Sequence, residues 1–188
     1  MALRAPTSQV CFICATATLP AMLVSNSAFA TDYMSAAAAQ RLMFPGASEF
    51  VPRALALTPE QTRLIASKAG APFSTAFWQL TAAMSGEQVL GYVVTDSVIG
   101  KFELIDYAVA LAPDGEIKDI EILSYREAHG GEVRTKAWRN QFVGKTVNAP
   151  LAIGDDIANI SGATLSCTHL TDGIRRIATY ARVALAKS

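Results

Sequence analysis

The sequence contains little cysteine, with three copies among 188 residues. Cys11 and Cys14 form a C-x-x-C pair, but both lie in an apolar N-terminal segment, which argues against a redox or metal site there. Without that segment only Cys167 remains, so an internal disulfide is excluded and stability must come from an apolar core. Cys167 itself is expected to be a small buried residue rather than a reactive thiol.

The chain also lacks an excess of charge of either sign. Lys and Arg together number 16, as do Asp and Glu, which leaves no basic surface for nucleic acid and no basic stripe for a membrane. Hydrophobic residues make up 51% and charged residues 17%, a composition that argues against disorder. The choice of partner must therefore depend on local features.

Histidine is equally sparse, and its two copies do not indicate a metal centre or a catalytic triad. His129 lies in a glycine-rich stretch and His169 early in a predicted helix, with no spacing typical of metal ligands. Ser161 lacks the G-x-S-x-G elbow of serine hydrolases. We therefore expect no metal and no catalytic residue; a hydrolase would instead show fluorophosphonate labelling of Ser161 or Ser166.

The apolar N-terminal stretch, residues 10–24, is too short to span a bilayer comfortably. It follows Arg4 and precedes Ala28-Phe29-Ala30, an A-x-A pattern typical of signal-peptide cleavage sites. The sequence thus predicts a signal peptide over residues 1–30, a single mature domain over residues 31–188 and a periplasmic location. If the segment stays uncut, it would serve as a membrane anchor.

The remaining pattern predicts an α+β domain, with an antiparallel sheet flanked by helices. Pro113-Asp114-Gly115 favours a tight turn, so the strands around it should form a hairpin. Thr58, Pro59 and Gln61 together predict a helix start with a capping box. The expected helices cover residues 31–43, 58–70, 135–142 and the segment from about 164 to 185, and the expected strands cover residues 88–96, 102–112 and 116–125.

The stretch Ser161–Ser166 is suited to hold a phosphate. It lies just before or at the first turn of the last helix, where unpaired N–H groups and the helix dipole attract an anion. Gly162 and Ala163 are small enough for a ligand or an enzyme to approach the backbone closely. Hydroxyl groups surround this spot, on Ser161, Thr164 and Ser166. From these residues alone, an ordinary helix cap is the alternative.

The same stretch, Ser161-Gly162-Ala163-Thr164-Leu165-Ser166, resembles the flavinylation motif of the FMN-binding domain family. That family includes the flavin-carrying C subunit of sodium-translocating NADH:quinone reductase and the G subunit of Rnf complexes. The resemblance implies FMN joined through its phosphate to Thr164 by a separate, magnesium-dependent FAD:protein FMN transferase. It also implies that the cofactor lies beside the other motif residues, which are Ser161, Gly162, Ala163, Leu165 and Ser166.

A second stretch, residues 124–133, is similar to the strand-then-glycine segment that lies near the flavin in this family. The resemblance places Glu127, Gly130 and Gly131 among the cofactor-binding residues. Paired glycines let a loop pass close to a flat ring or a phosphate, although a plain turn is the alternative from the residues alone. Including the link at residues 138–145, the resemblance covers roughly residues 90 to 180.

One position departs from the family pattern. An aspartate usually stands three residues before the motif serine, and here that position holds Ala158. The main hypothesis is an electron carrier, or an oxidoreductase component, that relays electrons between a membrane quinone or cytochrome module and an acceptor. The departure keeps an alternative open, a non-redox periplasmic sensor or assembly module with FMN loosely bound or absent.

Overall fold

The computed structural model describes residues 31–54, 58–69 and 79–185. The predicted signal peptide and Gly70, the expected last residue of the second helix, lie outside these ranges, so both stay predictions. Among the helices of the described ranges, none combines the length and the hydropathy that crossing a membrane requires.

An antiparallel sheet of six strands forms the centre of the domain, in the order β1-β6-β5-β4-β3-β2. This arrangement confirms the predicted α+β class. The strands are β1 (Thr31–Asp32), β2 (Glu49–Ala54), β3 (Gln79–Ser85), β4 (Gln88–Ile99), β5 (Leu104–Leu111) and β6 (Ile117–Tyr125).

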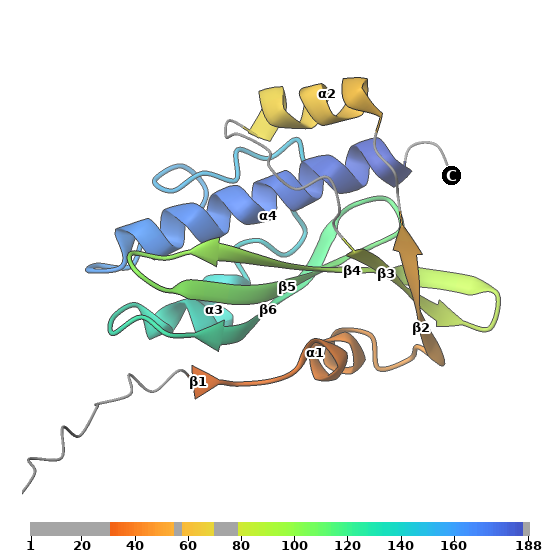
Figure 1. Ribbon diagram of the computed structural model, residues 1–188, viewed down its shortest axis with the longest axis horizontal. Helices are drawn as coiled ribbons and strands as arrows, with labels where there is room; N and C mark the ends of the chain where they lie inside the picture. The colour runs from red at the N-terminus through yellow and green to blue at the C-terminus, as the bar shows by residue number, and fades with distance from the viewer. Residues whose placement is uncertain (1–30, 55–57, 70–78, 186–188) are drawn as a thin grey trace, which may run out of the picture.

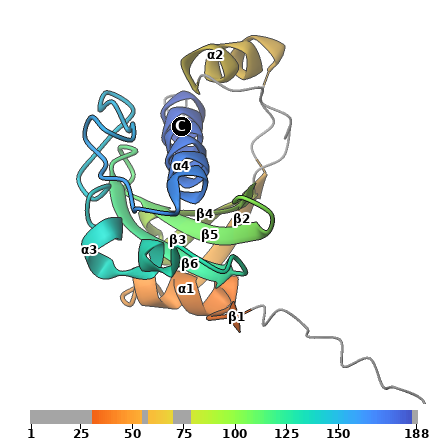
Figure 2. The same ribbon diagram turned by 90° about the vertical axis from the view of Figure 1, so that its left-hand side faces the viewer.

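Helices lie on both faces of the sheet (Figures 1 and 2). The long helix α4 (Thr164–Leu185) packs on one face, and α2 (Pro59–Ala69) lies on its outer side. Helix α1 (Ala36–Met43) covers part of the other face, and the short α3 (Lys136–Arg139) lies beside β6. A 3-10 turn, η1 (Gly131–Arg134), precedes α3.

Local sequence signals account for the helix starts. Thr58 and Gln61 exchange the two hydrogen bonds of the expected capping box at the start of α2. Helix α1 begins later than predicted, at Ala36 with Ser35 as its cap, because Thr31 and Asp32 pair with β6 instead. Helix α3 is shorter than the predicted 135–142, and turns follow it.

The predicted hairpin of β5 and β6 is confirmed, with Gly115 at a φ of +91° in the turn. Strand β4 runs to Ile99, beyond the expected end at Asp96, because its last residues still pair with β5. Strands β2 and β3 were not predicted. Their sequences, EFVPRA and QLTAAMS, are poor in β-branched residues, and Pro52 lies on an edge strand, where proline is tolerated.

Helix α4 approaches the sheet closely at Gly173. A Cβ at this position would lie 2.2 Å from the hydroxyl oxygen of Tyr107 on β5, so only glycine allows the contact. Tyr107 is fully buried there and donates a 2.9 Å hydrogen bond to Asp96 on β4. This packing holds the middle of α4 against β4 and β5, and the motif lies at the N-terminal end of the same helix.

Candidate functional site

The motif forms a turn that leads directly into α4. Thr164 is the first residue of the helix, and its side chain is exposed. Gly162 has a φ of +81°, a left-handed conformation that favours glycine. Ala163 is buried, and its carbonyl accepts from Cys167 N at 3.0 Å in the first helical turn.

Thr164 borders a hollow of about 320 Å³ at one end of the molecule. Three segments far apart in the sequence line it, namely the β4–β5 turn, the loop after β6 and the start of α4. The volume lies at the small end of the range for ligand pockets. Of the predicted site residues, the hollow is lined by Glu127, Gly162, Ala163, Thr164, Leu165 and Ser166, whereas Ser161, Gly130 and Gly131 do not line it.

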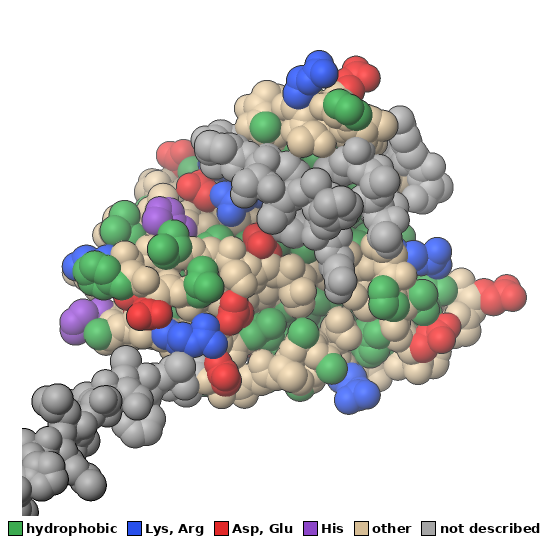
Figure 3. Space-filling model, viewed as in Figure 1, with side chains coloured by type: hydrophobic (Ala, Val, Ile, Leu, Met, Phe, Trp, Pro, Cys, Tyr) green, Lys and Arg blue, Asp and Glu red, His purple; other side chains and the backbone are tan. Residues whose placement is uncertain are grey.

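Two large apolar side chains form part of this lining while they face solvent. Phe102 is 72% exposed and Leu165 is 48% exposed. Ile99 and Leu104, also about half exposed, belong to the β4–β5 turn and its flanks. Figure 3 shows hydrophobic and histidine side chains gathered at this end of the molecule. Such a grouping is typical of an interaction surface or of a ligand-binding site.

Phe102 was not singled out from the sequence, because it lies in a segment predicted as strand. In the structure it belongs to the turn between β4 and β5, and Lys101 Nζ lies 4.9 Å from its ring centroid. The signal that could have identified it is a bulky aromatic residue two positions after Gly100, because glycine within a strand pattern marks an irregularity.

The Glu127 carboxylate is hydrogen-bonded to the backbone that forms one wall of the hollow, and it does not point freely into the hollow. Its Oε1 accepts hydrogen bonds from the backbone N–H groups of Phe102, at 2.6 Å, and Glu103, at 3.0 Å. A Cβ at Gly100 would lie 2.5 Å from the same oxygen, so glycine is required for this approach. Glu127 therefore holds the turn that carries Phe102.

The Glu127 carboxyl should contribute to a loss of folding stability at acidic pH. Partial burial by itself raises its pKa, but the backbone N–H groups of residues 101–103 and the Lys101 charge outweigh burial and hold the pKa below its ordinary value. The carboxylate thus stabilises the fold above the unfolded pKa of about 4.3, and this contribution is lost as pH falls through the folded pKa.

We therefore expect Glu127→Gln to lose less stability on acidification than the wild type. Urea unfolding in steps from about pH 6 to pH 3 measures the free energy of unfolding of both proteins. Asp106 and Asp156, whose pKa values are also lowered, are present in both, so the difference between the two curves isolates Glu127. Parallel curves would show that the carboxylate does not hold this turn.

The loop after β6 packs underneath the motif. The Tyr125 hydroxyl donates to the carbonyl of His129 at 2.5 Å and lies 3.4 Å from Ser166 Oγ. Gly130 has a φ of +88°, and a Cβ there would lie 2.2 Å from the Cβ of Ala163. The glycine therefore serves a close contact with the motif, while Gly131 is exposed and has nothing within 4 Å of its Cβ position.

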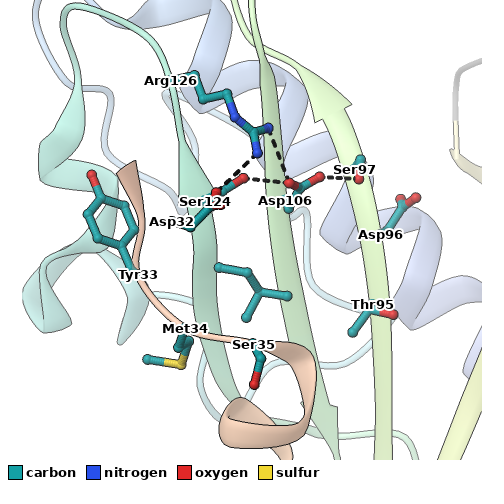
Figure 4. Close-up of a pocket in the computed structure, with 11 residues that line it drawn as sticks. Asp32, Tyr33, Met34, Ser35, Thr95, Asp96, Ser97, Asp106, Ser124 and Arg126 are labelled. Atoms are coloured by element: carbon teal, nitrogen blue, oxygen red, sulfur yellow. Dashed lines mark hydrogen bonds and ion pairs between the residues drawn. The ribbon is translucent and has the colours of Figure 1, made fainter. Parts of the chain in front are cut away.

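A larger hollow, about 650 Å³, lies beside the start of α1 (Figure 4). Three of its charged groups are engaged with one another, because Arg126 donates to Asp32 at 3.1 Å and to Asp106 at 3.4 Å. Asp106 also accepts from Ser97 and Ser124, each at 2.5 Å. Arg126 is thus committed to carboxylates rather than directed at a phosphate near Thr164, and none of the predicted site residues lines this hollow.

The other side chains considered from the sequence have structural roles. Cys167 is fully buried, and desolvation raises the pKa of its thiol, as expected for a small core residue. His169 Nδ1 lies 2.6 Å from the carbonyl of Ile99, and so ties α4 to the β4–β5 turn. Within the described residues, no group of three or more His, Cys, Asp or Glu side chains could hold a metal ion.

The segments that line this hollow fall within a stretch that is similar to known proteins. Residues 100–179 match the model of the FMN-binding domain family. The chain is also 30% identical over 101 residues to the G subunit of the proton-translocating ferredoxin:NAD(+) oxidoreductase complex of Clostridium ljungdahlii. That alignment covers 50% of this chain and 55% of the relative, so the chain spans about half the length of the relative it matches.

The matched segment contains every part of the site, from the β4–β5 turn through the loop after β6 to the motif and most of α4. The resemblance inferred from the motif is thereby confirmed. Residues 100–179, somewhat less than half of the chain, are thus similar to an FMN-binding domain.

Proposed function

We propose that this chain is an exported electron-transfer flavoprotein whose FMN is joined to Thr164 through a phosphoester. The observation that carries the proposal is the exposed Thr164 side chain, which stands at the first residue of a 22-residue helix and at the rim of an apolar-walled hollow. A hydroxyl in this place is open to a modifying enzyme, and it sits where helix N–H groups favour a phosphate.

The residues present fit FMN. The phosphate would lie at Thr164, against the first N–H groups of α4, with Ser161 and the small Gly162 and Ala163 alongside. The apolar ring would lie in the hollow, with Phe102 and Leu165 as its walls and Ser166 at its base. When bound, FMN supplies one- and two-electron redox chemistry, and the protein supplies position, dielectric and hydrogen bonds.

The redox partner in this proposal is a membrane module. The relative from Clostridium ljungdahlii is named as part of a ferredoxin:NAD(+) oxidoreductase complex. By similarity, we propose that this chain acts between a membrane quinone or cytochrome module and a further acceptor, in the periplasm. A covalent link suits such a carrier, because an exported cofactor held only by weak contacts would be lost by diffusion.

Intact mass of the protein isolated from its native compartment tests the proposal. We expect a gain equal to FMN less one water, together with a yellow colour that survives denaturation. Maturation should require an FAD:protein FMN transferase, so cells without that enzyme should yield the unmodified chain. A colourless, unmodified chain from cells that contain the transferase would favour the alternative, a non-redox sensor or assembly module.

A further inference from the structure

Asn159 contacts the proposed acceptor hydroxyl directly. Its amide Nδ2 donates a hydrogen bond of 2.9 Å to Oγ1 of Thr164. Both side chains are exposed, so water is available to each of them, and burial does not force them together. Asn159 does not line the hollow, so its contact with the site passes through Thr164.

The backbone that carries Asn159 is held in place by the core. The indole Nε1 of Trp138 donates to the carbonyl of Ala158 at 2.9 Å, and Ala158 N donates to Oε1 of Gln141 at 2.7 Å. Trp138 is buried and packs edge-on against Phe142, with ring centroids 5.1 Å apart. The residue before Asn159 is therefore anchored through both its backbone polar groups, and the amide projects from a defined position.

A hydrogen bond from Asn159 restricts what the Thr164 hydroxyl can do. The amide N–H occupies one lone pair of Oγ1, and it cannot accept the hydroxyl proton. That proton and the second lone pair are thus directed away from Asn159. The β-branched threonine side chain has few χ1 rotamers in a helix, so a single hydrogen bond suffices to select one of them.

We propose that Asn159 is a positioning residue for flavin attachment to Thr164, a role that rests on the proposed function. In the attachment, Thr164 Oγ1 attacks the flavin-side phosphorus of FAD. The Oγ1–P bond forms, the P–O bond of the pyrophosphate breaks, AMP leaves, and the hydroxyl proton passes to a base of the transferase. Asn159 keeps the attacking lone pair turned outward, which raises the fraction of productive encounters.

The position of Asn159 also bears on the departure from the family pattern. The aspartate usual in the family would stand at Ala158, and that side chain is exposed here. The polar contact to the acceptor comes from the adjacent residue, Asn159. An alanine at position 158 is therefore compatible with attachment at Thr164.

The test measures the rate of attachment. The full chain is purified unmodified from cells without the transferase and is then mixed with transferase, FAD and Mg²⁺. In-gel flavin fluorescence gives initial rates at several chain concentrations. Asn159→Ala removes the donor, and Asn159→Asp keeps the shape but replaces the donor with an acceptor. We expect kcat to fall about tenfold in both, with KM for the chain unchanged, as for the loss of one hydrogen bond.

Asn148→Asp is the matched control, because it adds the same charge at another exposed asparagine, outside the site. Its rate should equal that of the wild type, and all variants should keep the wild-type Tm. A wild-type rate in Asn159→Ala would overturn the positioning role and leave the proposed function standing. A raised KM at constant kcat in Asn159→Ala, or a lowered Tm of that variant, would overturn the positioning role too. If the wild-type chain takes no flavin, both proposals are wrong.

Discussion

Thr164→Val should abolish covalent flavin while the domain stays folded. Valine has the shape of threonine but no hydroxyl, so no Oγ1–P bond can form. The side chain is exposed, and the only hydrogen bond described for its hydroxyl comes from the exposed Asn159, so the loss of stability should stay below about 1 kcal/mol. Intact mass after coexpression with the transferase, together with thermal unfolding, measures both effects.

Thr168→Val provides the control for this experiment. Thr168 lies one turn further along α4, is half-buried and does not line the hollow. The Thr168→Val chain should therefore accept flavin at Thr164 at the wild-type level. Acid-stable flavin on the Thr164→Val chain would mean that another residue is the acceptor, and peptide mapping of that product would identify it.

Gly130→Ala should destabilise the domain by roughly 3 kcal/mol, because two costs act together. The residue has a φ of +88°, which strains any L side chain. The new methyl group would also lie 2.2 Å from Ala163 Cβ and 2.6 Å from the Tyr125 hydroxyl oxygen. Relief of the clash requires the motif to move, so attachment at the neighbouring Thr164 should slow as well. Urea unfolding measures the stability, and flavin fluorescence measures attachment.

Gly131→Ala separates this contact from a general effect of losing a glycine. The next residue has open space at its Cβ position and no positive φ, so its replacement should change stability by less than about 1 kcal/mol. Adding Ala163→Gly to Gly130→Ala removes one side of the clash and should recover part of the lost stability. Equal effects of Gly130→Ala and Gly131→Ala would contradict the close contact between this loop and the motif.

Much of the site could be predicted from the motif, whereas the residues that form the other walls of the hollow could not. The position of Thr164 at a helix start follows from residues within one turn of it, and five of the six motif residues line the hollow. Phe102 was missed because its exposure depends on where the β4–β5 turn lies relative to α4. The partners of Arg126 could not be predicted either, because it pairs with Asp32 and Asp106, which are 94 and 20 residues away in sequence.

The sequence by itself determined the features that depend on short-range chemistry. These are the capping box at Thr58, the turn at Gly115 and the entry of the motif into α4, each of which satisfies backbone groups with residues a few positions away. Such hydrogen bonds and dihedral preferences act before the chain is packed, so they can be read along the sequence.

Only the tertiary structure decided what surrounds the acceptor hydroxyl. The direction of the Glu127 carboxylate, the need for glycine at position 130 and the anchoring of Asn159 through Trp138 all depend on segments brought together by the sheet and by α4. These contacts join residues that are far apart in sequence, and their geometry is set by how side chains fill the space between the sheet and its helices. No pattern of neighbouring residues encodes that packing.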